Sequence, residues 1–134
     1  ANFHDASDRV DFVSGSFFEP ETLPKAMDGD AFYMRYILHD WPTDKVLTIL
    51  RNLRTAMGAA KVTLLIGECA LPDRHTVGVP PAMYNIDMQM MAAFGEAQER
   101  TPLQWDDVLK STGFKLVKLH PTRSLIHWVE ATPV

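Results

Sequence analysis

Two long apolar runs stand out in the pattern of hydrophobic and polar positions along the chain. Residues 31–38 (AFYMRYIL) are apolar at nearly every position apart from Arg35, and residues 61–67 (KVTLLIG) form a second, mostly apolar run. Runs of this length without regular polar alternation are typical of strands that are covered on both faces. We therefore predict two buried strands, at Ala31–Leu38 and Lys61–Gly67.

A helical pattern fills the space between these two strands. Pro42 suits the first turn of a helix, Asp44 suits the positive end of its dipole, and Gly58 suits the position after its last turn. The sequence thus predicts an amphipathic helix of about 15 residues. Its apolar side is formed by Val46, Leu47, Ile49, Leu50, Leu53, Ala56 and Met57.

Strand, helix and strand in this order predict a crossover unit with two parallel strands and a right-handed connection. Parallel strands end at the same edge of a sheet, so His39 and Glu68, which follow the two runs, should emerge on one side. If the strands are neighbours, about 5 Å apart, the two side chains can meet. Open α/β sheets place their chemistry at this edge, and we predict His39 as the reactive centre. A single histidine at a strand end is more often structural, so this prediction depends on the surrounding motifs.

The segment before the first apolar run contains one further strand candidate. Val10–Val13 (VDFV) has the composition of a short strand, and Ser14-Gly15-Ser16 follows it as a turn. Glu19–Asp30 carries two prolines and an Asp-Gly-Asp sequence, which predicts a loop with one helical turn.

The carboxyl-terminal half predicts two helices and a hairpin. Ala82–Phe94 has helical spacing, and the sequence TPLQ at 101–104 is a capping box that opens a second helix ending near Thr112. Phe114–His120 and Leu125–Ala131 are strands whose short connection makes them antiparallel. The expected fold class is therefore α/β, with a mixed sheet and an antiparallel carboxyl-terminal hairpin.

The first of these two helices is rich in methionine. Met83, Asp87, Met90 and Phe94 recur at helical spacing, and Met88 and Met91 lie between them. Methionines fill irregular cores, and this alternative stays open. They also form adaptable, polarisable walls for flat apolar ligands. The density of methionines favours the pocket, with Met83, Asp87, Met90 and Phe94 as its substrate-binding side.

Composition and charge exclude several classes of protein. A chain of 134 residues with 46% hydrophobic content is long enough for one domain and one core. Its net charge of -4 lacks the basic footprint of a nucleic-acid binder, and no polybasic run favours a membrane surface. No signal-peptide pattern is present and no apolar run approaches the roughly 18 residues of a membrane span. Cys69 is the only cysteine, which excludes an internal disulfide and favours a cytoplasmic protein.

The sequence also lacks the glycine-rich turn that holds a nucleotide in dinucleotide-binding folds, because its seven glycines are scattered. The predicted sheet therefore has the character of the second half of a larger α/β domain. A sheet without its other half would expose a strand edge and apolar faces.

Three motifs in order carry a resemblance to a known family: RYILHDWPTDK, IGECALP and QERTPLQWDDVLKSTGF. Together they resemble the carboxyl-terminal part of the small-molecule O-methyltransferases of the caffeate and acetylserotonin type, from about Val10 to Val134. The resemblance implies a partial Rossmann-like, class I methyltransferase fold over residues 1–134, which lacks the amino-terminal glycine-rich half. It also implies that the full-length enzyme is a homodimer.

The resemblance implies methyl transfer from S-adenosylmethionine to a hydroxyl, usually a phenolic one, of a small molecule. His39 corresponds to the general base, and Glu68 and Glu99 correspond to the two acidic residues beside it. The chemistry fits, because a phenol with a pKa near 10 is a poor nucleophile until an imidazole takes its proton. Carboxylates would fix the tautomer of that imidazole, and no metal is required. The remaining histidines have no such context and are predicted to be structural: His4, His75, His120 and His127.

The resemblance also places three residues near the cofactor. Arg35 occupies a position that is often basic in the family, although it could instead pair with a buried acid. Ser16 stands where the family commonly has an acidic residue, so it cannot supply the same charge, whereas Phe17 could pack against an adenine ring. Asp40 could either orient His39 or cap the following helix.

Two hypotheses about function follow from the sequence. In the first, the chain is the catalytic half of an O-methyltransferase, and it binds cofactor only when the rest of the domain is supplied. In the second, it is a non-catalytic module that binds a partner chain through its uncovered edge. The presence of His39, Glu68 and Glu99 together favours the first, and the absence of the glycine-rich loop favours the second.

Overall fold

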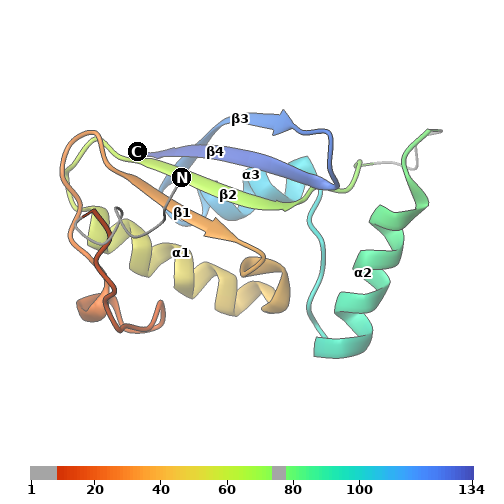
Figure 1. Cartoon of the computed structure of the whole chain (residues 1–134), viewed down its shortest axis with the longest axis horizontal. Coiled ribbons are helices and arrows are strands. Elements are labelled where there is room, and N and C mark those ends of the chain that lie inside the picture. Colours follow the sequence, from red (N-terminus) through yellow and green to blue (C-terminus); the bar gives the residue numbers. More distant parts are fainter. Residues whose placement is uncertain (1–8, 74–77) are drawn as a thin grey trace.

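The computed structural model describes residues 9–73 and 78–134, which form one four-stranded sheet in the order β1-β2-β4-β3 (Figure 1). Its strands are β1 (Ala31–Arg35), β2 (Thr63–Cys69), β3 (Phe114–Pro121) and β4 (Ile126–Pro133). β1 and β2 are parallel, whereas β4 runs antiparallel to both β2 and β3. The predicted α/β fold with a parallel crossover and an antiparallel hairpin is confirmed.

Two helices cover one face of this sheet. α1 (Thr43–Met57) connects β1 to β2, and α3 (Pro102–Lys110) precedes β3. The capping box predicted for α3 is present, because Gln104 N–H donates to Thr101 Oγ1 and the Gln104 side chain accepts from Thr101 N–H. The two helices and the sheet enclose the main core. Its fully covered members include Leu38, Val46, Ile49, Leu50, Leu64, Ile66, Leu109 and Val129.

The third helix, α2 (Pro81–Phe94), stands beside the sheet beyond the carboxyl end of β2 (Figure 1). Of its residues only Met83 is buried, and it packs with Cys69 and Leu71 in a small second cluster. Within the described ranges, no helix combines the length and hydrophobicity needed to cross a bilayer.

The predicted strand at Val10–Val13 is wrong. This segment forms no regular secondary structure, and the side chain of Phe12 is 96% exposed. A strand needs a neighbour to satisfy its backbone groups, and in the part of the chain that the structure describes β1 pairs only with β2. Residues 10–13 have the composition of a strand, but no neighbouring strand in the described chain pairs with them.

The prediction that Ala31–Leu38 forms a strand buried on both faces is also wrong. β1 ends at Arg35 and lies at the edge of the sheet, and Met34 is its only buried residue. Tyr36 then adopts a positive φ of 52°, which turns the chain into a short 3-10 helix, η3 (Leu38–Asp40). The opposite face of β1 is open, with Tyr33 56% exposed and in contact with Trp128 at a ring-centroid distance of 5.4 Å.

Candidate active site

The turn that carries His39 lies at the carboxyl ends of β1 and β2, as the crossover predicts. Glu68 lies in β2, one residue before the strand ends, and not after it as predicted. Its Oε1 accepts hydrogen bonds from Ile37 N–H at 3.0 Å and Leu38 N–H at 2.9 Å. A fully buried carboxylate thus holds the amino-terminal side of η3 against the sheet.

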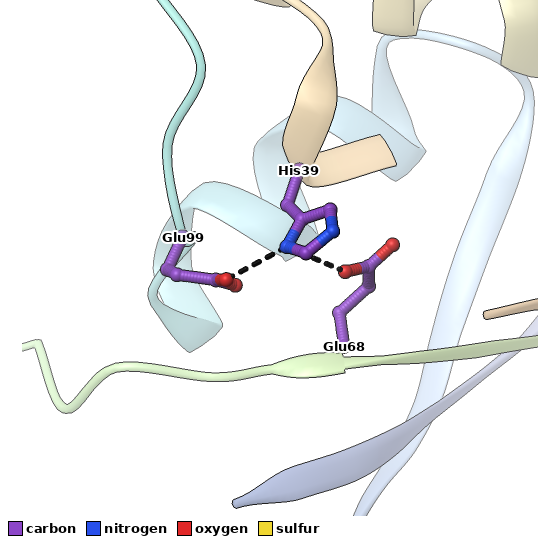
Figure 2. A group of neighbouring side chains, drawn as sticks. All are labelled: His39, Glu68 and Glu99. Carbon is purple, nitrogen blue, oxygen red and sulfur yellow. Dashed lines mark hydrogen bonds and ion pairs between the residues drawn. The ribbon is translucent and has the colours of Figure 1, made fainter. Parts of the chain in front are cut away.

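Glu68 and Glu99 converge on one nitrogen of the His39 ring, from two different elements (Figure 2). Nδ1 lies 2.8 Å from Glu99 Oε1 and 3.6 Å from Glu68 Oε2. The other ring nitrogen, Nε2, lies 3.4 Å from Asp40 Oδ1. The three predicted catalytic side chains are therefore brought together, and all three are buried.

This arrangement fixes the tautomer of a neutral His39. A carboxylate can only accept a hydrogen bond, so Nδ1 must carry the hydrogen that it donates to Glu99 Oε1. The lone pair of the neutral ring is then on Nε2. This nitrogen, which has Asp40 Oδ1 3.4 Å away, is the one that can accept a proton.

Electrostatics raises the pKa of His39 above its ordinary value of 6.5. Burial alone lowers this pKa and is the largest single effect, but the hydrogen bond to Glu99 and the charges of Glu68, Glu99 and Asp40 together outweigh it. The pKa of Glu68 is also raised, chiefly by burial, despite the opposing effects of His39 and the two backbone N–H groups.

The segment that carries Glu99 is fastened to both the turn and α2. Gln98 N–H donates to the carbonyl of His39 at 3.2 Å, and Glu99 N–H donates to Asp87 Oδ1 at 2.8 Å. Asp87, which we predicted in the substrate wall, thus has a carboxylate oxygen engaged in positioning Glu99. The interpretation of Asp40 as a helix cap is not supported, because no side chain caps α1.

The predicted substrate wall is spread along α2. Met83 is buried in the second core cluster, Met90 is half-buried, and Phe94 is 55% exposed. At 1.5 Å per residue, about 16 Å separates the two ends of this set along the helix. Met83 also lines a cavity together with Leu71 and Leu119, whereas Phe94 lies at the carboxyl-terminal end of α2. That these side chains contact a substrate remains a prediction.

The same three side chains, His39, Glu68 and Glu99, are the one group of histidine, cysteine and carboxylate residues in the described part of the chain that could hold a metal ion. Their potential ligand atoms lie within 4.8 Å of one another. However, Glu68 Oε1 already accepts from two backbone N–H groups and Glu99 Oε1 is hydrogen-bonded to Nδ1. That no metal is needed remains a prediction.

Comparison with known proteins identifies the family of this chain. A family model described as an O-methyltransferase domain matches residues 1–115. The chain belongs to the O-methyltransferase family. Phenazine O-methyltransferase PhzM from Lysobacter antibioticus is 37% identical over 128 residues, which cover 95% of this chain and 35% of that protein.

Solved structures of this family share the fold. The crystal structure of LaPhzM has a TM-score of 0.80 at 36% identity, and the match covers 97% of this chain and 37% of that one. NcsB1, an O-methyltransferase from neocarzinostatin biosynthesis in complex with S-adenosylmethionine and 2-hydroxy-5-methyl naphthoic acid, has a TM-score of 0.78 at 27% identity. That match covers 97% of this chain and 35% of the NcsB1 chain, so this chain spans about a third of these family members.

The three residues predicted near the cofactor differ in how well they fit S-adenosylmethionine, the cofactor expected in this family. Phe17 is half-buried and meets the ring of Trp41 edge-on at a centroid distance of 5.9 Å, next to the His39 turn, so it fits an adenine ring in chemical type. Ser16 Oγ accepts from Phe18 N–H within its own loop. Arg35 is exposed, and its guanidinium lies 5.1 Å from the centroid of the Tyr36 ring, not against a buried acid.

Two predicted structural histidines fall in the described ranges. His120 pairs with Glu130 at 2.7 Å on the antiparallel hairpin, and His127 lies on β4 opposite Glu68. His4 and His75 lie outside the described residues.

Proposed function

We propose that residues 1–134 are the carboxyl-terminal part of the catalytic domain of an S-adenosylmethionine-dependent O-methyltransferase that acts on a phenolic hydroxyl of a small molecule. The observation that carries this proposal is the His39–Glu99 hydrogen bond of 2.8 Å at Nδ1, which leaves Nε2 as the basic nitrogen. The full-length protein that contains these residues is called the complete enzyme below. We further propose that it is a cytoplasmic homodimer of secondary metabolism, consistent with the phenazine-methylating relative.

The residues of this chain supply the acid–base part of the reaction. His39 Nε2 accepts the proton of the substrate hydroxyl while the oxygen becomes a nucleophile. Glu99 keeps the proton on Nδ1, and the charges of Glu68 and Glu99 stabilise the imidazolium that forms. When bound, S-adenosylmethionine supplies an activated methyl group on a sulfonium sulfur. The half-buried Phe17 would pack against its adenine ring.

The alternative, a non-catalytic module, is favoured by two features of the structure. Tyr33 is 56% exposed on the open face of the sheet, and β1 has a free edge in the described chain. A partner chain could cover this surface. However, binding through this edge would not involve the buried His39–Glu99 pair, and burying such a pair carries a desolvation cost.

The pH dependence of methyl transfer tests the role of His39 as the base. The neutral ring is the active form and its pKa is raised, so kcat/KM for methylation of a phenol should rise with pH through an apparent pKa above 6.5. In Glu99→Gln the amide oxygen can still accept from Nδ1, but the negative charge is gone. The pKa of His39 should therefore fall, and the acid limb should move to lower pH.

The matched control for this measurement is Glu96→Gln, which removes an exposed carboxylate three residues earlier in the same loop. The control should leave the limb unchanged. An acid limb at the same pH in the wild type and Glu99→Gln would contradict the proposed contact between Glu99 and the base.

Substrate recognition by α2 gives a separate test. Met90 is half-buried near the carboxyl end of α2, so Met90→Ala should change the order of preference among phenols of different size while the affinity for S-adenosylhomocysteine stays within about twofold. Steady-state kinetics with a series of phenols and calorimetric titration measure the two effects. Met88→Ala, at a position that is 60% exposed, is the control. The reverse result, weaker cofactor binding with an unchanged preference, would place this side of α2 at the cofactor.

A further inference from the structure

Arg100 is a charged residue that is only 1% exposed and that the proposed reaction does not use. It lies between Glu99 and the Thr101 cap of α3, and its own carbonyl accepts a hydrogen bond from Leu71 N–H at 3.2 Å. Residues Ala70 and Arg100 form a parallel bridge at this point. The backbone of Arg100 is thereby attached to the residues that follow β2, so the position from which its side chain extends is fixed.

The guanidinium of Arg100 spans the turn that carries His39. Nη1 donates to the carbonyl of Leu38 at 3.0 Å, and Nη2 donates to the carbonyl of Trp41 at 3.2 Å. These two carbonyls lie on either side of His39 in the chain. Because a guanidinium is planar and its donors diverge in a rigid fork, the two bonds fix the spacing of the carbonyls as well as their position.

The other side of the guanidinium is held by α3. Its central carbon lies 5.6 Å from the centroid of the Trp105 ring, which is itself 1% exposed. Burial lowers the pKa of Arg100, and the charges of Glu68 and Glu99 oppose this effect. A buried cation thus lies between a rigid helix, the turn of the candidate base and the two buried acids.

Glu68 and Arg100 hold the His39 turn at different backbone groups. Glu68 binds the N–H groups of Ile37 and Leu38, on the side where the chain enters η3. Arg100 binds the carbonyls of Leu38 and Trp41, and the latter lies on the side where the chain leaves η3. Without Arg100, the bond from Gln98 N–H to the His39 carbonyl would remain, but the carbonyls of Leu38 and Trp41 would lose this partner. The backbone of the turn could then shift, which would change the direction of Nε2.

We propose that Arg100 is a positioning residue, which fixes the backbone of the His39 turn through the carbonyls of Leu38 and Trp41 and so aims Nε2 at the substrate hydroxyl. This inference rests on the proposed function of His39 as the general base. Two consecutive residues thus act on His39 in different ways. Glu99 sets the tautomer of its ring, and Arg100 sets the position of the backbone that carries the ring.

Two variants of the complete enzyme test this role. Arg100→Lys keeps the charge but replaces the planar fork by one ammonium nitrogen on a flexible stem, so the spacing of the two carbonyls is no longer fixed. We expect its kcat to fall about 100-fold, the scale of a misplacement of roughly 1 Å, with the KM for the phenol, the affinity for S-adenosylhomocysteine and the acid limb of the pH profile close to the wild type. In Arg100→Ala, added ethylguanidinium should raise kcat at least tenfold by occupying the vacated space.

Arg54→Ala is the matched control. Arg54 also donates to two backbone carbonyls, those of Gly58 at 2.7 Å and Val134 at 3.2 Å, but it does so at the opposite end of α1. Its removal should leave kcat unchanged, and ethylguanidinium should have no effect on it.

Three results would overturn the inference: wild-type kcat in Arg100→Lys, a loss of activity explained entirely by a shifted acid limb, or a loss of S-adenosylhomocysteine binding in parallel with activity. His39→Gln separates this failure from that of the proposed function. If His39→Gln is inactive and Arg100→Lys is fully active, only the positioning role is lost. If His39→Gln retains full turnover, the base assignment itself is wrong.

Discussion

Replacing His39 by glutamine should lower the kcat of the complete enzyme by about two to four orders of magnitude, the usual contribution of a positioned acid–base group. A glutamine amide can still donate to Glu99 Oε1, but it has no nitrogen that takes up a proton near neutral pH. The affinity for S-adenosylhomocysteine should change little, because Phe17, which we propose packs against the adenine ring, is untouched. Steady-state kinetics and calorimetric titration measure these two quantities.

His120→Gln is the matched control for this experiment. Like His39, His120 is hydrogen-bonded to a glutamate, at 2.7 Å from Glu130, but it lies on the hairpin, where it lines a cavity with Tyr33 and Trp128 on the open face of the sheet. It should retain wild-type turnover. Equal turnover in His39→Gln and the wild type would remove His39 from the role of base.

The second large effect is expected for Glu68→Ala, on stability. Glu68 is fully buried and accepts from Ile37 N–H and Leu38 N–H, so alanine would leave two backbone donors without a partner. Each orphaned buried donor costs about 1–3 kcal/mol, and we expect the free energy of unfolding to fall by about 2–6 kcal/mol. Urea denaturation followed by circular dichroism measures this loss.

Glu68→Gln separates the structural from the electrostatic contribution of the same side chain. The amide oxygen can accept from both N–H groups, so stability should stay within about 1 kcal/mol of the wild type. The negative charge 3.6 Å from His39 Nδ1 is lost, however, and kcat should decrease. If Glu68→Ala unfolds at the same urea concentration as the wild type, the two backbone hydrogen bonds do not hold the turn.

The parts of the fold that the sequence predicts are those governed by local periodicity and chain direction. The helical spacing after Pro42 and the capping box at Thr101 each depend on residues close together in the chain, and both are present. The meeting of His39 with Glu68 follows from the parallel crossover, because that connection places two strand ends at one edge.

Contacts that depend on how a loop folds back cannot be derived in this way. Glu99 lies 60 residues from His39, and no periodicity specifies that its loop returns to the turn; only the family resemblance suggested it. Arg100 was missed because a charged residue in a loop is ordinarily solvated. Its partners are backbone carbonyls, which every residue type provides, so the sequence around Leu38 and Trp41 carries no signal of them.

The two failed strand predictions have a common physical cause. Composition describes how well a segment suits a pleated surface, but pairing depends on which strands are available beside it. Val10–Val13 has no partner in the described chain, and β1 has one. An edge position and an open face are properties of the neighbours, so no inspection of residues 31–38 alone could predict them.

The run Glu99-Arg100-Thr101 limits how the length of this chain can vary. These consecutive residues attach to the His39 ring, the carbonyls of the His39 turn and the start of α3, respectively. An inserted or deleted residue would displace these side chains from their partners and break the attachments together. We therefore expect that a change of length within these three positions disrupts the site, whereas substitutions at exposed positions of α2 such as Met88 and Met91 leave the attachments intact.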